Sequence, residues 1–384
     1  MKLIHLSDLH LGKRYNEYSL LEDQKYILEA ILNIIDDEQP DAVLIAGDVY
    51  DKAVPSAEAV ELFDDFLVRL AARRYHGRQL QTFVISGNHD SPERLAFGGR
   101  LMDASGVHLA PVYSGHVAPV TLTDAYGPVN IYMLPFVKPV HVRRFFPDAA
   151  IGSYTDAIAV AVREMSIDTA ARNVLIAHQF VTGAERSESE ELSVGGLDNV
   201  DAAAFEGFDY VALGHIHGPQ NIGSPRIRYC GTPLKYSFSE AQHEKSVTVA
   251  ELGAKGDLAV RTLPLKPKRD LVELSGCYED VMHKSFYEGT NWQEDYVRIT
   301  LTDEEEIPEA MGRLRAVYHN LMKMGYDNTR TRRNVQIEAV ADVEKKTPLE
   351  LFAELYEKQN GRAPDEEQQK LLRELIETIW EDEA

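Results

Sequence analysis

The chain of 384 residues contains only two cysteines, Cys230 and Cys277, and no apolar stretch that approaches the ~20 residues of a membrane-spanning helix. Two cysteines cannot supply the set of disulfides that stabilises small secreted proteins. The first residues have the pattern of a strand and not of a signal peptide. We therefore expect a cytoplasmic protein without a membrane segment.

Basic residues are scarce as well. The chain has 40 Lys and Arg against 62 Asp and Glu, a formal net charge of −22, whereas proteins that bind nucleic acid usually present a basic surface. Part of the excess lies at the end of the chain, where residues 341–384 hold 13 acidic and 6 basic residues, a net charge of −7. This balance argues against tight DNA binding by the chain alone.

The length allows two or three folded units, and a hydrophobic content of 44% is ordinary for a globular protein. Residues 1–265 alternate strand and helix patterns, with helices predicted over 20–35 and 56–70 and Ser56 as the cap of the second. Later segments read as strands without intervening helices. The pattern predicts an α/β fold, a two-sheet sandwich flanked by helices.

Residues 263–270 read as a linker into a second, smaller unit over 266–344. Its pattern predicts strands at DLVELSG and DYVRITLT and a helix from Ile307 to Met324. A third unit, 345–384, is predicted to hold two amphipathic helices, over 349–359 and 366–380. The charged run 185–191 is interpreted as a solvated loop.

Five short apolar runs each end in metal-binding side chains. They are LIHLSDLH (3–10), AVLIAGD (42–48), TFVISGNHD (82–90), NVLIAHQ (173–179) and YVALGHIH (210–217). Runs of this kind are typical of strands buried on both faces, and α/β folds bind ligands at the carboxyl ends of such strands. The side chains gathered there are Asp8, His10, Asp48, Asn88, His89, His178, His215 and His217.

These side chains offer oxygen and imidazole nitrogen without a thiolate, which suits Mn²⁺, Mg²⁺, Fe²⁺ or Zn²⁺ in a catalytic site. Two ions about 3.5–4 Å apart need a shared ligand, for which Asp48 is the candidate. Such a pair would generate hydroxide from water and attract phosphate, because its charge exceeds that of Asp8 and Asp48. His89, next to Asn88, is the candidate general acid for the departing alkoxide.

The motifs D-x-H, GD-x-x-D, GNHD, a lone strand-end His and GHIH resemble those of the calcineurin-like metallophosphoesterases. More narrowly, SDLHLGK, SVGG (193–196) and CGTPLKYSFSE (230–240) are similar to the SbcD family, nuclease subunits that work with the ATPase SbcC in DNA repair and recombination. The resemblance covers residues 1 to about 269 with specific motifs. It implies a two-metal phosphodiesterase, an exonuclease on duplex ends and an endonuclease on single strands or hairpins.

The resemblance also implies roles for individual residues. One metal, with Mn²⁺ as the expected ion, would lie on Asp8, His10, Asp48 and His217, and the other on Asp48, Asn88, His178 and His215, with His89 as the catalytic acid. Relatives carry a second histidine at the position of Asp51. The expected phosphate contacts of a capping domain are Lys266, Lys268, Arg269, Arg330, Arg332 and Arg333.

For assembly, the resemblance implies a homodimer within a heterotetramer with SbcC. Residues 60–70 are a candidate dimer contact, although they could equally cover the sheet, and the terminal helices are the candidate docking element for SbcC. The stripes expected on those helices comprise Leu351, Phe352, Leu355 and Tyr356 on the first, and Leu371, Leu372, Leu375, Ile376, Ile379 and Trp380 on the second.

Three alternatives stay open. A small-molecule phosphodiesterase or nucleotidase would use the same metal core. A protein phosphatase of this superfamily is expected to carry GD-x-x-D-R-G and GNHE, whereas this chain has GDVYDKA and GNHD. A binding module on the same fold is expected to have lost ligands, and all seven are present.

Overall fold

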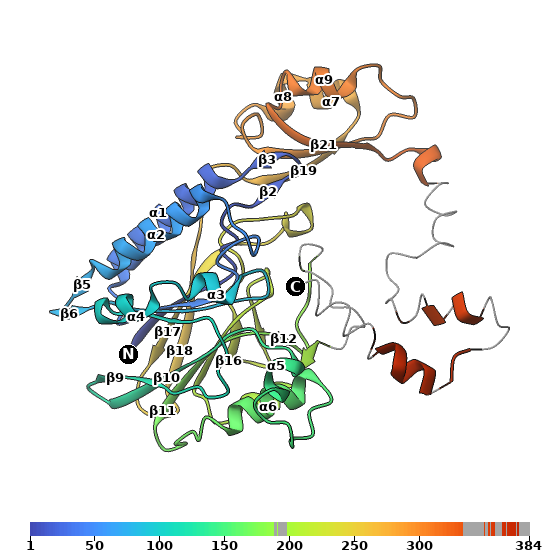
Figure 1. The fold of residues 1–384 in the computed structure, drawn as a ribbon. Coiled ribbons are helices and arrows are strands. Elements are labelled where there is room, and N and C mark those ends of the chain that lie inside the picture. Colours follow the sequence, from blue (N-terminus) through green and yellow to red (C-terminus); the bar gives the residue numbers. More distant parts are fainter. Residues whose placement is uncertain are drawn as a thin grey trace.

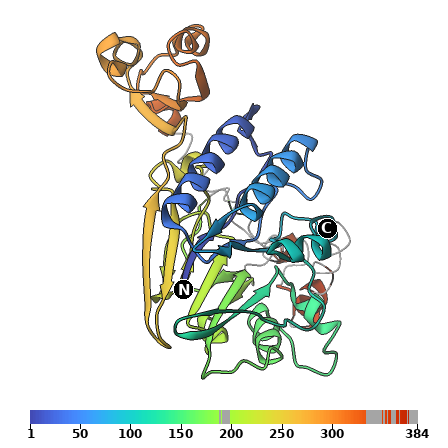
Figure 2. The same cartoon turned by 90° about the vertical axis from the view of Figure 1, so that its left-hand side faces the viewer.

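The computed structural model describes residues 1–187, 190 and 198–332 and, nearer the end of the chain, residues 349, 352–353, 355–357, 363–365, 367–373 and 375. Two six-stranded sheets form its centre, with helices on their outer faces (Figure 1 and Figure 2). The predicted α/β sandwich of two sheets is therefore confirmed.

The first sheet contains three of the five expected ligand strands as parallel neighbours, with an antiparallel pair completing one edge. In spatial order its strands are β18 (Leu258–Pro264), β17 (Ser246–Leu252), β1 (Lys2–Leu6), β4 (Ala42–Ala46), β7 (Gln81–Ile85) and β8 (Val107–Ala110). The carboxyl ends of β1, β4 and β7 meet at one edge because these strands run in parallel.

The second sheet contains the other two ligand strands, β11 and β14, which are also parallel neighbours. In spatial order its strands are β15 (Gln220–Ile222), β16 (Ser224–Tyr229), β14 (Tyr210–Gly214), β11 (Arg172–His178), β10 (Gly127–Leu134) and β9 (Val120–Asp124). Three small two-stranded pairs join β2 (Arg14–Tyr15) to β3 (Tyr18–Ser19), β5 (Arg74–Tyr75) to β6 (Arg78–Gln79), and β12 (Phe180–Val181) to β13 (Asn199–Val200).

The continuous apolar runs follow from burial on both faces. In β4, Leu44 packs between the two sheets against Ile131 and Ile176, whereas its neighbours Val43 and Ile45 pack against the helices on the outside. Successive side chains of a strand point to opposite faces, so a strand enclosed on both sides has no solvent-facing position for a polar residue.

Helices α1 (Leu21–Glu38) and α2 (Ala57–Ala71) cover the outer face of the first sheet, and α6 (Tyr154–Arg163) covers the second. The Ser56 hydroxyl accepts a hydrogen bond from the Ala59 amide (3.3 Å), which confirms Ser56 as the cap of α2. The shorter helices are α3 (Pro92–Leu95), α4 (Gly99–Met102), α5 (Pro139–Arg143) and three 3₁₀ turns, η1 (Asp103–Ser105), η2 (Ala202–Phe205) and η3 (Phe238–Glu240).

Residues 271–326 form a smaller sheet with its own apolar core, drawn in orange in Figure 1. Three parallel strands, β19 (Leu271–Gly276), β20 (Tyr296–Leu301) and β21 (Asn320–Tyr326), are accompanied by α7 (Tyr278–Met282), α8 (Lys284–Tyr287) and α9 (Ala310–Arg315). The strands at DLVELSG and DYVRITLT are found as predicted.

The helix predicted from Ile307 to Met324 is wrong, because α9 ends at Arg315 and residues 320–326 form β21. Leu314, Tyr318 and Leu321 have helical spacing and share one core, which accounts for the error. The chain turns after α9, and the Tyr318 hydroxyl donates to the carbonyl of Val281 (2.7 Å). Pairing with β20 then determines the conformation of the last residues.

The smaller unit is attached to α1 by a cluster of charged and polar contacts. The buried Asp23 carboxylate accepts hydrogen bonds from Arg269 Nε (2.9 Å) and the Tyr296 hydroxyl (2.7 Å), and Glu22 pairs with Lys268 and Arg269. Arg269 and Lys268, expected to contact phosphate, are thus engaged with helix α1 of the larger unit.

The other expected phosphate contacts have mixed outcomes. Arg330 pairs with Glu306, and Arg332 pairs with Asp327 (2.7 Å). Lys266 is exposed, and Arg333 lies outside the described residues. Four of the six charges pair with carboxylates of the chain, and the pairs of Arg330 and Arg332 are exposed, so the contact of this group with phosphate stays a prediction.

Near the end of the chain, residues 352–353, 355–357, 367–373 and 375 are helical. Phe352, Leu355, Leu371 and Leu375 are exposed there. Leu351, Ile376, Ile379 and Trp380 lie outside the described residues. Within the part of the chain that is described, none of the helices combines the length and the apolarity that crossing a bilayer requires.

Candidate metal centre

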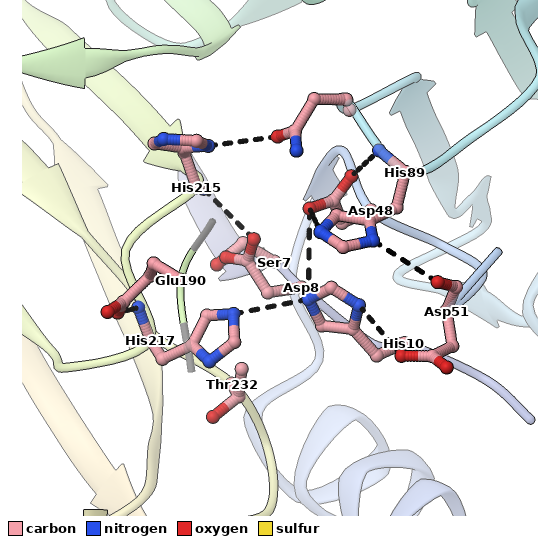
Figure 3. A network of polar contacts seen from close by, with 12 residues as sticks. Ser7, Asp8, His10, Asp48, Asp51, His89, Glu190, His215, His217 and Thr232 are labelled. Carbon is pink, nitrogen blue, oxygen red and sulfur yellow. Dashed lines mark hydrogen bonds and ion pairs between the residues drawn. The ribbon is translucent and has the colours of Figure 1, made fainter. Parts of the chain in front are cut away.

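The five predicted loops converge where the two sheets face each other at their carboxyl edges (Figure 3). Asp8 and His10 follow β1, Asp48 follows β4, and Asn88 follows β7. His178 ends β11, and His215 and His217 follow β14. All seven expected ligands are therefore brought together.

On one side of the site, two histidine rings meet edge-on. His10 Nε2 lies 3.2 Å from His217 Nε2, and Asp8 offers a donor within 4.8 Å of both rings. Asp8 Oδ1 accepts from the His215 amide (2.9 Å), whereas Asp8 Oδ2 is buried without a hydrogen-bond partner. An orphaned carboxylate oxygen beside two imidazole nitrogens is the arrangement that a cation satisfies.

On the other side, the amide oxygen of Asn88 lies between two rings. It is 3.0 Å from His178 Nε2 and 2.9 Å from His215 Nδ1. His178 Nδ1 donates to the carbonyl of Ala46 (2.8 Å), which directs Nε2 into the site. Against the effect of burial, the Asp48 carboxylate raises the pKa of His178 to about 9, so a bound cation would take the place of the proton on Nε2.

Asp48 lies between the two groups. Its Oδ2 is 3.3 Å from His178 Nε2 and 3.7 Å from His10 Nε2, and its Oδ1 accepts from the His89 amide (2.9 Å). The imidazoles around it, His178 foremost, outweigh the effect of burial and hold the pKa of Asp48 well below its usual range. A permanently ionised carboxylate in this position can be shared by two cations.

The backbone conformation of the site is strained. Asp8, His10, Asp48 and His215 have φ of 52°, 44°, 46° and 100°, in the left-handed region that non-glycine residues seldom adopt. The residue before His215 must be glycine, because a Cβ at Gly214 would collide with the carbonyl of Ala46. The rest of the fold must therefore hold these side chains in place.

The donor set fits divalent cations. Burial lowers the pKa of both His10 and His215 well below the usual value, which favours the neutral form that ligands need, whereas Glu240 raises the pKa of His217 against the effect of burial, so that ring would release a proton when it binds a cation. Cys230 points elsewhere and donates to the carbonyl of His5 (2.9 Å). Oxygen and imidazole donors of this kind bind Mn²⁺, Mg²⁺, Fe²⁺ or Zn²⁺.

His89 lies at the edge of the same cluster and is less buried than the ligands, with a side chain 17% exposed. Its Nδ1 is 3.1 Å from the backbone carbonyl of Asp51, which leaves Nε2 directed into the site, 4.0 Å from Asp48 Oδ2. The side chain of Asp51 pairs instead with Lys13 (2.8 Å) and lies 3.8 Å from His10 Nδ1.

Sequence reasoning missed several residues that support the site. Asp90 accepts hydrogen bonds from the amides of Val49 (3.1 Å), Tyr50 (2.9 Å) and Gly87 (3.0 Å), and so ties the second motif loop to the third. Asp90 is the last residue of the GNHD motif, which is the sequence feature that could have identified it. Gln24 donates to the carbonyl of His10 (2.7 Å), and no motif marked it.

Two glutamates hold the GHIH loop. Glu240, in the motif CGTPLKYSFSE, lies 3.2 Å from His217 Nδ1, and Glu190 accepts from the His217 amide (2.7 Å). Glu190 is buried, so the interpretation of the run 185–191 as a solvated loop is wrong for this residue. Residues 188–189 and 191 of that run lie outside the described residues.

Comparison with known proteins agrees with this geometry. Residues 1–219 match the family model of the calcineurin-like phosphoesterases, and residues 267–360 match that of the "Type 5 capsule protein repressor C-terminal domain". A dimetal phosphatase from Danio rerio aligns over 69% of this chain and 98% of its own, with 10% identity and a TM-score of 0.37, too low to carry an argument. The fold and the family match together define a hydrolase of the calcineurin-like phosphoesterase superfamily.

Two curated relatives narrow the assignment. The SbcD component of the nuclease SbcCD from Staphylococcus epidermidis is 34% identical over 348 residues, covering 89% of this chain and 90% of its own. The protein of the same name from Staphylococcus saprophyticus is 34% identical over 327 residues, 84% of each chain. The chain belongs to the SbcD family, as the motifs predicted.

Proposed function

We propose that this chain is a metal-dependent DNA nuclease that works with an SbcC-type ATPase, an exonuclease on duplex ends and an endonuclease on single strands or hairpins. The observation that carries the proposal is the convergence of seven oxygen and imidazole donors on one buried site, in a chain similar over most of its length to SbcD nucleases. Bound divalent cations, Mn²⁺ in this proposal, would activate water and hold the phosphodiester.

Each residue has a distinct role in this proposal. Asp8, His10 and His217 hold one cation, Asn88, His178 and His215 hold the other, and Asp48 is shared between them. His89 donates a proton to the departing 3′ or 5′ oxygen through Nε2. Asp90 and the backbone carbonyls keep the motif loops in register for this chemistry.

The same proposal includes a domain layout, an assembly and a location in the cytoplasm. Residues 1–265 would be the nuclease domain, 266–344 a capping domain, and 345–384 the SbcC-docking element. A homodimer within a heterotetramer would use residues 60–70 of α2. Phe63 and Phe66 of this helix pack on the sheet, while Val60 and Val68 remain exposed. Since the chain is acidic, the partner would supply much of the DNA contact.

The test is a Mn²⁺-dependent assay of linear duplex, circular single-stranded DNA and a small phosphodiester, with and without the ATPase. We expect cleavage of DNA, with duplex cleavage enhanced by the ATPase, and no activity of Asp48→Asn. Hydrolysis confined to the small phosphodiester, even with the ATPase present, would instead establish a small-molecule phosphodiesterase.

A further inference from the structure

The motif CGTPLKYSFSE has no role in the metal centre itself, yet its last residue reaches a proposed ligand. Glu240 is fully buried, and its Oε1 lies 3.2 Å from His217 Nδ1. It is placed by the 3₁₀ turn η3, in which the Glu240 amide donates to the carbonyl of Ser237 (3.0 Å). The contact spans 23 residues of sequence.

A buried cation holds the other oxygen of this carboxylate. Lys245 Nζ lies 2.5 Å from Glu240 Oε2, and also donates to Thr232 Oγ1 (2.7 Å) and to the carbonyl of His217 (2.9 Å). Thr232 in turn lies 3.3 Å from Glu240 Oε2. Glu240 therefore contacts the ring of His217, and Lys245 contacts its backbone carbonyl.

The carboxylate fixes the tautomer of His217. An ionised carboxylate only accepts hydrogen bonds, so His217 Nδ1 carries the proton and the lone pair is on Nε2. That nitrogen faces His10 Nε2 at 3.2 Å. His178, on the other side of the site, is oriented by the neutral backbone carbonyl of Ala46. The two sides of the centre are thus supported by partners of different charge.

We propose that Glu240, held by Lys245, is the positioning residue of His217, which fixes its ring and increases its basicity as a ligand for one of the two divalent cations. The proposal rests on the proposed function for the existence of that cation site. Carboxylate partners of ligating histidines typically change metal affinity by about 10- to 100-fold. We therefore expect one of two Mn²⁺ affinities to depend on Glu240 while the other does not.

The experiment measures Mn²⁺ binding by the full-length protein, through the loss of the free-ion electron paramagnetic resonance signal on titration. Glu240→Gln is compared with Glu244→Gln, an exposed carboxylate four residues away that makes the same charge change. Because a lone variant leaves Lys245 unpaired in the interior, the double variant Glu240→Gln/Lys245→Met removes the ion pair as a unit. Thermal unfolding in EDTA reports the fold without metal.

The wild type and Glu244→Gln should each bind two ions with the same affinities. Glu240→Gln and the double variant should bind one ion about 10- to 100-fold more weakly, while the double variant should unfold at a higher temperature in EDTA than Glu240→Gln. Wild-type Mn²⁺ affinity in the double variant would reduce the network to a structural role and overturn the proposal. Equal weakening by Glu244→Gln would overturn it too, whereas a wild type without bound Mn²⁺ would refute the proposed function itself.

Discussion

Removal of His89 should separate proton donation from every other function of the site. The ring packs edge-on against His10 and its Nδ1 is engaged by the carbonyl of Asp51 (3.1 Å), so Nε2 is available to the departing oxygen. General acid catalysis contributes typically 10²–10⁴-fold, or about 2.7–5.5 kcal/mol of activation free energy. His89→Ala should lower DNA cleavage by a factor in this range.

The assay compares two leaving groups. An alkoxide of DNA needs a proton on departure, whereas a p-nitrophenolate leaves without one. His89→Ala should therefore lose about 10²–10⁴-fold on DNA and far less on bis-p-nitrophenyl phosphate, with Mn²⁺ binding unchanged. Asp51→Asn is the control, because it alters the pair with Lys13 but retains the carbonyl that holds His89.

An equal loss on both substrates would refute the reasoning, since it would mean that His89 acts on the metal or on phosphate binding. His89 has a geometry that allows this, because it forms a donor group within 4.8 Å with His10 and Asp48. If Asp51→Asn lost as much DNA cleavage as His89→Ala, the reasoning would also fail, because the Asp51 carboxylate would then be the group that matters.

Three further predictions follow from named contacts. Asp48→Asn should lose proper placement of both cations and nearly all cleavage, and a wild-type rate with Mn²⁺ would rule out Asp48 as the shared ligand. Asp23→Ala should lower the free energy of unfolding by about 1–3 kcal/mol in urea titration, because Tyr296 and Arg269 lose a buried acceptor; an unchanged unfolding midpoint would contradict the role of this contact in attaching the smaller unit to α1. Deletion after Glu344 should retain Mn²⁺-dependent cleavage and abolish co-purification with the ATPase, whereas an insoluble or inactive product would assign the tail to the nuclease core.

The two-sheet sandwich could be predicted because the sequence features that specify its strands lie within short segments. The centre of a strand enclosed on both sides is apolar, so β4 and the segment 174–177 of β11 can be recognised from four or five residues. The cap of α2 is equally local, since Ser56 meets an amide three residues away. The helix predicted over 307–324 failed for the opposite reason. Leu314, Tyr318 and Leu321 share a core at helical spacing, and only the pairing of β21 with β20 distinguishes strand from helix.

The same distinction holds within the site. The proposed ligands lie within a few residues of strand ends, so motif and position together identify them. The groups that orient the ligands come from elsewhere in the chain: Glu240 reaches His217 across 23 residues, and Gln24 reaches His10 across 14. One of them, the carbonyl of Ala46 beside His178, belongs to the backbone and has no sequence signature. A change outside the motifs, as at Gln24, can therefore misdirect a ligand, and the contacts that orient the ligands can be identified only in the three-dimensional structure.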